Sequence, residues 1–224
     1  MKNILHIDAS ARKADREIAA HNSISRQLGQ KFITRWMSLS HQTKVCYRDL
    51  YQEPIPFIDA DWIAAVFAKP APSETQQQHL DLSDRLIAEV AAADLIVITT
   101  PMYNYGMPAI LKAWFDQVIR VNKTFSFDLA RGDYPLEPIL TGKTLVLLTS
   151  SGEFGFAEGL ERAQLDHLVP HIKLLSRYLG VADFYVVRSE YQEFADARHQ
   201  HSRAQAEQQA VQLAEQLASI ANLT

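Results

Sequence analysis

The sequence predicts an α/β fold in which one parallel sheet carries helices on both faces. Apolar runs of strand length alternate with helical patterns along the whole chain, which is the order of elements that such folds use. Residues 95–98 are apolar at every position, as expected of a parallel strand buried on both faces. The apolar residues that follow recur at the spacing of a helix with one buried face: Leu111, Trp114, Phe115 and Val118.

The first half of the chain is predicted to contain two more strands and three helical segments. Ser23 is a good N-cap, and residues 73–76 read Ser-Glu-Thr-Gln, which is a capping box. Residues 44–49 alternate between apolar and polar, which is typical of a strand near a sheet edge. The expected elements are a strand at 4–7, a helix at 23–38, a strand at 44–49, a short helical segment at 59–67 and a helix at 73–92.

The second half of the chain is predicted to continue the alternation. A helix starts near Pro108, where a missing N–H does no harm, and an aromatic connection spans residues 122–142. A buried strand at 144–150 and the last strand at 184–188 flank a helix at 160–179. The final helix carries its apolar face at Ala206, Ala210, Leu213, Leu217 and Ile220. No internal repeat or linker divides the sequence, so we expect a single domain over residues 1–224 with five strands.

The composition excludes several classes of protein. With 47% hydrophobic and 21% charged residues, the chain can bury a core, and no apolar run approaches the length of about 18 residues that a membrane span needs. His6 and Asp8 interrupt the first apolar run too early for a signal peptide. Cys46 is the only cysteine, which fits a reducing cytoplasm. A net charge of −4 without a basic run argues against nucleic acid as a partner.

Three junctions between a strand and the following loop carry the candidate chemistry. They converge if the strand order is 2-1-3-4-5, the flavodoxin-like order, in which FMN binds at the point where the order reverses. Hydroxyls and free N–H groups at a helix start can hold a phosphate, and a glycine lets the backbone approach a flat ring. The first junction contains Ser10, Ser23, Ile24 and Ser25; the second contains Met102, Tyr103, Asn104 and Tyr105; the third contains Ser150, Ser151, Gly152 and Glu153.

Each junction also has an ordinary structural interpretation. A serine at a helix start is most often only a cap, a tyrosine-rich loop is most often surface packing, and Ser-Ser-Gly is a common turn. Their occurrence at the ends of the first, third and fourth strands together favours a shared ligand site at one sheet edge.

Competing motifs are incomplete. No Gly-x-Gly-x-x-Gly follows the first strand, and no Gly-x-Ser-x-Gly nucleophile elbow is present. Residues 141–144 mimic the end of a P-loop, but Glu137 replaces the required glycine and a strand follows, which indicates a turn. His167 and His171 lack the adjacent glutamate of a zinc motif, and Pro170 disturbs the turn between them, so we expect no metal.

At this point the residues resemble a known family. Pro101-Met-Tyr-Asn-Tyr105 together with Leu111-Lys-Ala-Trp-Phe-Asp116 resembles the FMN-dependent NADH azoreductases, which are also NADH:quinone oxidoreductases. The segment 106–112 is similar to the wider NAD(P)H quinone reductases of the flavodoxin-like fold. Shorter matches in the same order span nearly the whole chain, at 25–28, 48–50, 54–56, 82–84, 124–125 and 141–143.

The resemblance assigns roles by position. It places the FMN phosphate at Ser10, Ser23, Ile24 and Ser25, and the flavin ring at Met102, Tyr103, Asn104 and Tyr105 and then at Ser150, Ser151, Gly152 and Glu153. It also implies a substrate wall at Phe125 and Phe127, although core packing is an equal alternative for Phe125. Arg12, Lys13 and Arg16 lie in a segment, 11–22, that is longer than in typical members. A solvated loop is the favoured interpretation there, and proximity to the phosphate is the alternative.

Two departures from the family pattern bear on the substrate. The usual Ser-Arg-Gly-Gly of the third junction is here Ser-Ser-Gly-Glu, which loses a cation and introduces the carboxylate of Glu153. Phe127 stands where a tyrosine is common.

The resemblance implies a two-electron, ping-pong oxidoreductase. NADH or NADPH is the electron donor, a quinone or azo compound is the acceptor, FMN carries the redox chemistry, and the active site lies at a homodimer interface. No side chain has to act as acid or base. The alternatives are a one-electron carrier of the flavodoxin type, which is typically shorter and more acidic, and a flavin-free regulatory domain. The second is disfavoured because Asp8 has no acidic neighbour in sequence.

Overall fold

The computed structural model describes residues 2–15, 17–18, 21–40 and 42–223. Its main sheet is parallel and has five strands in the order β2-β1-β3-β6-β7. If only these strands are counted, the order is 2-1-3-4-5, so the predicted topology is confirmed. The strands are β1 (Lys2–Asp8), β2 (Thr43–Asp49), β3 (Leu95–Pro101), β6 (Lys143–Ser150) and β7 (Val181–Ser189).

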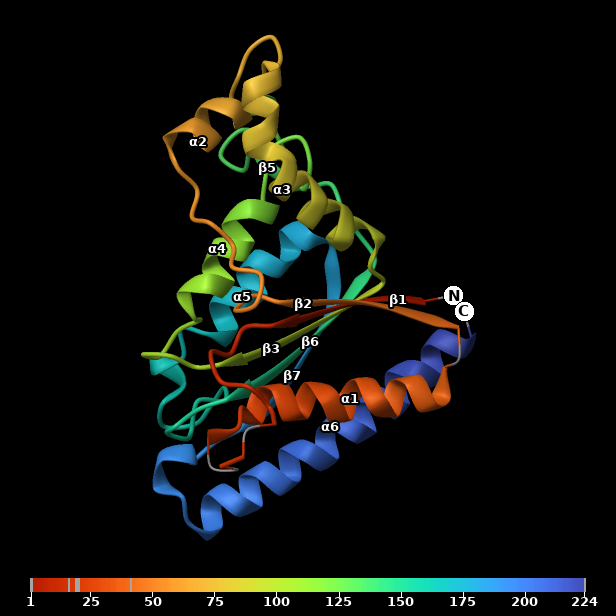
Figure 1. The fold of residues 1–224 in the computed structure, drawn as a ribbon, viewed down its shortest axis with the longest axis vertical. Helices are drawn as coiled ribbons and strands as arrows, with labels where there is room; N and C mark the ends of the chain where they lie inside the picture. Colours follow the sequence, from red (N-terminus) through yellow and green to blue (C-terminus); the bar gives the residue numbers. More distant parts are fainter. Residues whose placement is uncertain (1, 16, 19–20, 41, 224) are drawn as a thin grey trace.

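Helices cover both faces of this sheet (Figure 1). One face carries α1 (Ile24–Leu39) and α6 (Ala197–Leu223), which lie side by side below the strands in the figure. The other face carries α3 (Glu74–Ala92), α4 (Ala109–Val118) and α5 (Val169–Ser176). A short helix, α2 (Ala60–Val66), packs on α3 beyond the sheet through Trp62 and Leu80. None of the helices in the described part of the chain is long and apolar enough to cross a membrane.

The caps predicted from the sequence are present. The Ser23 side chain accepts a hydrogen bond from the N–H of Arg26 and so begins α1. Ser73 and Gln76 form the reciprocal bonds of a capping box at the start of α3. These bonds satisfy N–H groups that the first turn of a helix cannot pair internally. They therefore fix where each helix starts relative to the strand before it.

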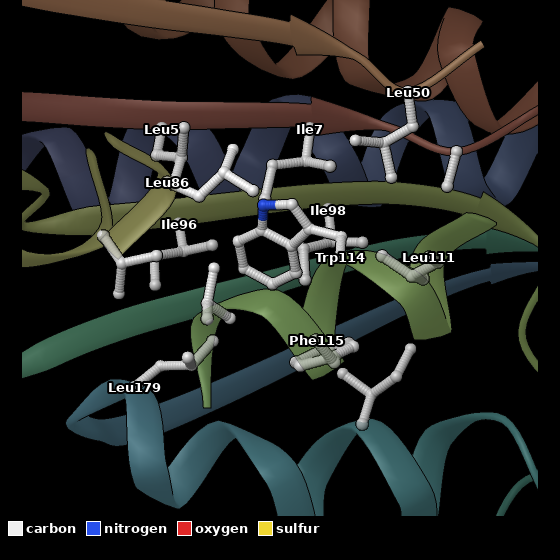
Figure 2. Packing of buried hydrophobic residues seen from close by; sticks show 14 of the residues in the cluster. Leu5, Ile7, Leu50, Leu86, Ile96, Ile98, Leu111, Trp114, Phe115 and Leu179 are labelled. Carbon is white, nitrogen blue, oxygen red and sulfur yellow. The ribbon is translucent and has the colours of Figure 1, made fainter. Parts of the chain in front are cut away.

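The core consists of two layers, because alternate residues of each strand point to opposite faces. In β3, Ile96 and Ile98 face α3 and α4, whereas Leu95 and Val97 face α1 and α6. Trp114 of α4 lies at the centre of the first layer, and its ring lies among Ile98, Leu111 and other apolar side chains (Figure 2). This packing holds the β3–α4 connection rigidly against the sheet.

The prediction of a helix over residues 160–179 is wrong for the first half of that range. The helix α5 begins only at Val169, with Pro170 in its first turn, and a short 3₁₀ segment lies upstream at Ala163–Leu165. Asp166 ends that segment, because its carboxylate accepts hydrogen bonds from the N–H groups of Leu168 and Val169. A local side-chain acceptor thus competes with helix propagation.

Two other details differ from the sequence expectations. The connection over 122–142 contains a small antiparallel sheet of β4 (Phe125–Phe127) and β5 (Leu136–Pro138). Ile220 is 51% exposed, whereas Ala214 and Ala218 take the buried positions of α6. The face of α6 that packs on α1 therefore consists mainly of small residues, which lets the two helices approach closely.

Candidate functional site

A cavity of about 190 Å³ opens at the carboxyl ends of β1, β3 and β6. This is the edge at which the chain order reverses between β1 and β3, where open α/β sheets bind their ligands. Residues from all three predicted junctions line it. The lining residues are Ser10, Arg12, Asn22, Ser23, Ile24, Pro101, Met102, Tyr103, Ser150, Gly152, Gln192 and Glu193.

The first wall of the cavity is the loop after β1 and the start of α1. Ser10, Ser23 and Ser25 are all buried, and the hydroxyls of Ser23 and Ser25 lie 3.2 Å apart. The Ser23 side chain accepts a hydrogen bond from the N–H of Arg26. The N–H groups of Ile24 and Ser25 remain at the positive end of the helix dipole. Neutral hydroxyls and helix N–H groups of this kind form an anion site.

The second wall is a tight turn after β3. Tyr103 and Gly106 exchange backbone hydrogen bonds of 3.0 Å in both directions, and Asn104 and Tyr105 between them have φ angles of 48° and 65°. Positive φ at both central positions defines a type I′ turn. A tyrosine in the left-handed region is strained by about 1 kcal/mol, and such strain is often found at functional sites.

The third wall is the loop after β6, which is tied to a fourth loop after β7. The N–H groups of Tyr191, Gln192 and Glu193 donate to the carbonyls of Glu153, Ser151 and Gly152, at 3.2, 3.1 and 3.1 Å. A Cβ added to Gly152 would lie 2.4 Å from Cγ of Glu193. Gly152 therefore gives room for the Glu193 side chain of the fourth loop, in addition to any approach of a ligand.

The structure brings most of the predicted site residues together. Seven of them line the cavity: Ser10, Ser23, Ile24, Met102, Tyr103, Ser150 and Gly152. Ser25, Asn104, Tyr105, Ser151 and Glu153 belong to the same loops but do not line it. Of the cations in the long first loop, Arg12 lines the cavity, Lys13 is exposed and does not, and Arg16 lies outside the described residues.

The residues predicted to form the substrate wall, Phe125 and Phe127, lie outside this cavity. Phe125 packs against Tyr178, with ring centroids 5.5 Å apart, and Phe127 is 53% exposed on the small sheet. Neither residue lines the cavity. Any contact of Phe127 with a substrate therefore needs a surface that this chain alone does not enclose.

Sequence reasoning did not identify Gln192 and Glu193. They follow the last strand, and the carboxyl end of a parallel strand always reaches the same edge as its neighbours. That rule could have identified residues 190–194, but their side chains match no motif. The described residues contain no cluster of His, Cys, Asp and Glu that could hold a metal ion.

The fold and the cavity define a flavodoxin-like protein, and comparison with known proteins agrees. Residues 2–214 match the model of a family described by its flavodoxin-like fold, and this chain belongs to that family. Within it, the chain is 56% identical to FMN-dependent NADH:quinone oxidoreductase 2 of Colwellia psychrerythraea, over 97% of this chain and 100% of that protein. The protein of the same name from Idiomarina loihiensis is 53% identical, over 97% and 91% of the two chains. The resemblance seen in the sequence is thus confirmed.

Solved structures show the same fold. An azoreductase of Bacillus anthracis superposes with a TM-score of 0.83 at 20% identity, covering 96% of this chain and 100% of the other. An FMN-dependent NADH-azoreductase of the same species, in complex with FMN, gives a TM-score of 0.78 at 20% identity, covering 96% and 100%.

Proposed function

We propose that this protein is an FMN-dependent NADH:quinone oxidoreductase that also reduces aromatic azo compounds. One observation carries the proposal: Ser10, Met102 and Ser150 lie at the ends of different strands and line one cavity at the switch point, together with Ser23 and Ile24 at the N-terminus of α1. The relatives that match the chain over nearly its full length are named for FMN, NADH and quinone. The single free cysteine, Cys46, is compatible with a reducing cytoplasm, where NADH is available.

The donor set of the first wall fits a flavin phosphate. Ser10, Ser23, Ile24 and Ser25 offer buried hydroxyls and helix N–H groups, which suit a dianion without needing a buried cation. Arg12 is exposed at the rim of the same cavity and adds a positive charge near this end.

The second and third walls fit a flat ring. Met102 and Tyr103 supply apolar and aromatic contact, and Gly152 presents backbone without a side chain. The N–H of Asn104 has no partner among the described residues, so it is free to donate to an electron-rich edge of a ring. Ser151 and Glu153 fix the loop, since the Ser151 hydroxyl donates to the Glu153 carbonyl at 2.9 Å.

When bound, FMN would supply the redox chemistry, which is hydride transfer from NADH or NADPH and two-electron transfer to an acceptor. The protein binds and orients both substrates. As the resemblance to the family implies, the nicotinamide and the acceptor use the same face of the ring in turn, which gives ping-pong kinetics. Tyr103 and Asn104 polarise the ring, and no side chain has to transfer a proton.

The test is a spectroscopic titration of the purified protein. We expect a yellow protein, or a colourless one that takes up FMN, whose absorbance bleaches with NADH under anaerobic conditions and returns with menadione or methyl red. Failure to take up FMN would overturn the flavin proposal. Bound FMN that NADH cannot bleach would indicate a one-electron carrier of the flavodoxin type.

A homodimer completes the proposed site. The connection over 122–142 exposes several large apolar side chains, and exposed apolar surface that is concentrated in one segment is typical of an interface. These side chains are Phe127, Leu129, Tyr134, Leu136 and Ile139. A second copy covering them would bury Phe127 and let it face the acceptor.

Light scattering after gel filtration tests this assembly. Leu129→Asp and Tyr134→Asp should give monomers with impaired turnover, because each places a charge in the patch. Ile220→Asp is the matched control, since Ile220 is a similarly exposed apolar residue on α6. A wild-type monomer with full activity would contradict the dimer.

A further inference from the structure

Three ionised side chains are buried together directly beneath the first wall of the cavity. Arg26 of α1 is 6% exposed, and Asp8 at the end of β1 and Asp49 at the end of β2 are 4% and 6% exposed. Asp8 and Asp49 are register partners in the sheet, so both strands present a carboxylate at the same level. Buried charges at this density are costly unless every one of them is paired.

Arg26 pairs with both carboxylates, although its buried Nε atom has no hydrogen-bond partner in the described part of the chain. Its Nη1 and Nη2 atoms donate to the two carboxylate oxygens of Asp49 at 2.7 and 2.8 Å, which is a bidentate fork, and Nη1 also donates to Asp8 at 3.1 Å. The Nη2 atom donates a further bond of 2.7 Å to the backbone carbonyl of Ser10. The guanidinium thereby joins two strand ends to the loop that follows β1. A lysine could not make this planar, multivalent contact.

Asp8 is also held by side chains other than Arg26. The Tyr47 hydroxyl donates to Asp8 at 2.6 Å, the Thr99 hydroxyl donates to its second oxygen, and Nε2 of His6 lies 3.2 Å from that oxygen. Burial opposes ionisation of Asp8, but these partners outweigh it and hold the pKa of the carboxyl below its ordinary value. The network therefore stays ionised at neutral pH.

The helix that carries Arg26 approaches the sheet unusually closely. A Cβ on Gly29, one turn further along α1, would lie 2.5 Å from Cγ2 of Thr99 and 2.9 Å from Nε2 of His6. The glycine thus allows the start of α1 to lie directly over the strand ends. This geometry lets the Arg26 side chain reach under the loop.

Arg26 does not line the cavity, although Ser23 and Ile24 immediately before it do. Its bond draws the Ser10 carbonyl inward, and the Ser10 hydroxyl accepts a bond from the N–H of Arg12 at 3.2 Å. We infer that Arg26 is a positioning residue for the phosphate subsite: it fixes the Ser10 loop against the N-terminus of α1, so that the donors of both converge on one phosphate. The inference rests on the proposed binding of FMN in this cavity.

The charge balance supports a positioning role over a direct one. One guanidinium and two carboxylates leave the network with a net negative charge. The carboxylates would repel a phosphate if they were free to reorient toward it. Arg26 instead holds both carboxylates, Asp49 through the fork and Asp8 through a single bond, and the hydroxyl and helix N–H donors of the first wall are neutral. Phosphate affinity then depends on the geometry of the loop, so a change beneath it should weaken phosphate binding selectively.

The experiment compares FMN with riboflavin, which has the same ring but no phosphate. Arg26→Lys keeps the charge and loses the fork; one lost charge-assisted bond should raise the Kd for FMN about tenfold, measured by quenching of flavin fluorescence. The Kd for riboflavin should stay at the wild-type value. Arg35→Lys is the matched control, because Arg35 lies on the same helix and pairs with Glu215 at the surface; it should leave both constants unchanged.

Asp49→Asn is the second variant, in case Arg26→Lys does not fold. It is isosteric, removes one charge of the fork, and should also weaken FMN but not riboflavin. An unchanged FMN Kd in either folded variant, or an equal loss for FMN and riboflavin, would overturn the positioning role. A wild-type protein that binds riboflavin and FMN equally would do the same, whereas a wild-type protein that binds neither flavin would overturn the proposed function itself.

Discussion

The Tyr105 hydroxyl donates a hydrogen bond of 3.4 Å to Oε1 of Glu153, which joins the turn after β3 to the loop after β6. The other oxygen of Glu153 lies 3.4 Å from Nε of Arg162, whose guanidinium lies 4.2 Å above the ring of Phe154. The sequence indicates that a cation is lost at position 151 and a carboxylate gained at 153. In the structure Arg162, from a later loop, pairs with this carboxylate and with Glu161.

This pair predicts how the charge of an acceptor affects turnover. Glu153→Gln leaves Arg162 with Glu161 as its remaining carboxylate partner, and the net charge of the group becomes more positive. It should favour a sulfonated quinone over menadione by about twofold in kcat/KM, since charges at the solvent-exposed rim are strongly screened. Arg162→Gln should shift the same ratio in the opposite direction. Glu158→Gln, an exposed glutamate in the same loop, is the control. Shifts of the same sign in both variants would contradict the pairing.

The type I′ turn predicts opposite outcomes for two substitutions of Asn104. Asn104→Gly should keep the turn and the FMN Kd, because glycine adopts positive φ without strain. Asn104→Val should cost about 1–2 kcal/mol in the free energy of unfolding and weaken FMN, because a β-branched residue is strongly disfavoured there. Urea unfolding and flavin titration measure the two effects. Weaker FMN binding by Asn104→Gly would show that the side chain, rather than the backbone, matters.

The contact between Gly152 and Glu193 predicts a rescue. Gly152→Ala places its methyl group 2.4 Å from Cγ of Glu193, so the Glu193 side chain and the loop that carries it must shift or reorient and FMN binding should weaken by about tenfold. Adding Glu193→Ala removes the obstacle and should restore most of the affinity in a double-mutant cycle. Additive losses would mean that the methyl group obstructs the flavin itself.

The topology was predictable because it depends on local patterns. The buried strand at 95–98 and the caps at Ser23 and Ser73 each follow from a few adjacent residues, and the parallel alternation then leaves few possible orders. The three junctions were predictable for the same reason, since each follows a strand end.

The features that the sequence did not reveal depend on distant residues. Arg26 meets Asp49 across 23 positions, and no periodic pattern records that contact. Lys143 belongs to the segment that mimics a P-loop, yet its Nζ donates to the carbonyls of Ala91 and Ala93 at 2.9 and 2.6 Å, at the end of α3. Lys143 places a positive charge at the C-terminus of α3. This role can be recognised only once the positions of β6 and α3 in the fold are known.

The carboxylates beneath the first wall predict a specific response to acid. Burial raises the pKa of Asp49, but hydrogen bonds from Arg26 and from the N–H of Tyr51 outweigh this, so the pKa lies below its ordinary value of 3.8; Asp8 is shifted in the same direction. A lowered pKa in the folded state means that the unfolded state binds more protons near that pH. The stabilisation is therefore complete above the ordinary pKa and is lost as the pH falls through the lower, folded-state value.

Asp49→Asn isolates this contribution. It should lower the urea midpoint at pH 7, because Arg26 loses an ionic partner, and the midpoint should then fall less steeply with acidification than that of the wild type. The two curves should converge only below the lowered, folded-state pKa of Asp49, where the wild-type carboxylate is also protonated. Asp133→Asn, at an exposed site outside the network, should follow the wild-type curve throughout. Wild-type and Asp49→Asn curves that stay parallel down to the acid transition would mean that Asp49 contributes nothing through its charge, and the fork would then act by hydrogen-bond geometry alone.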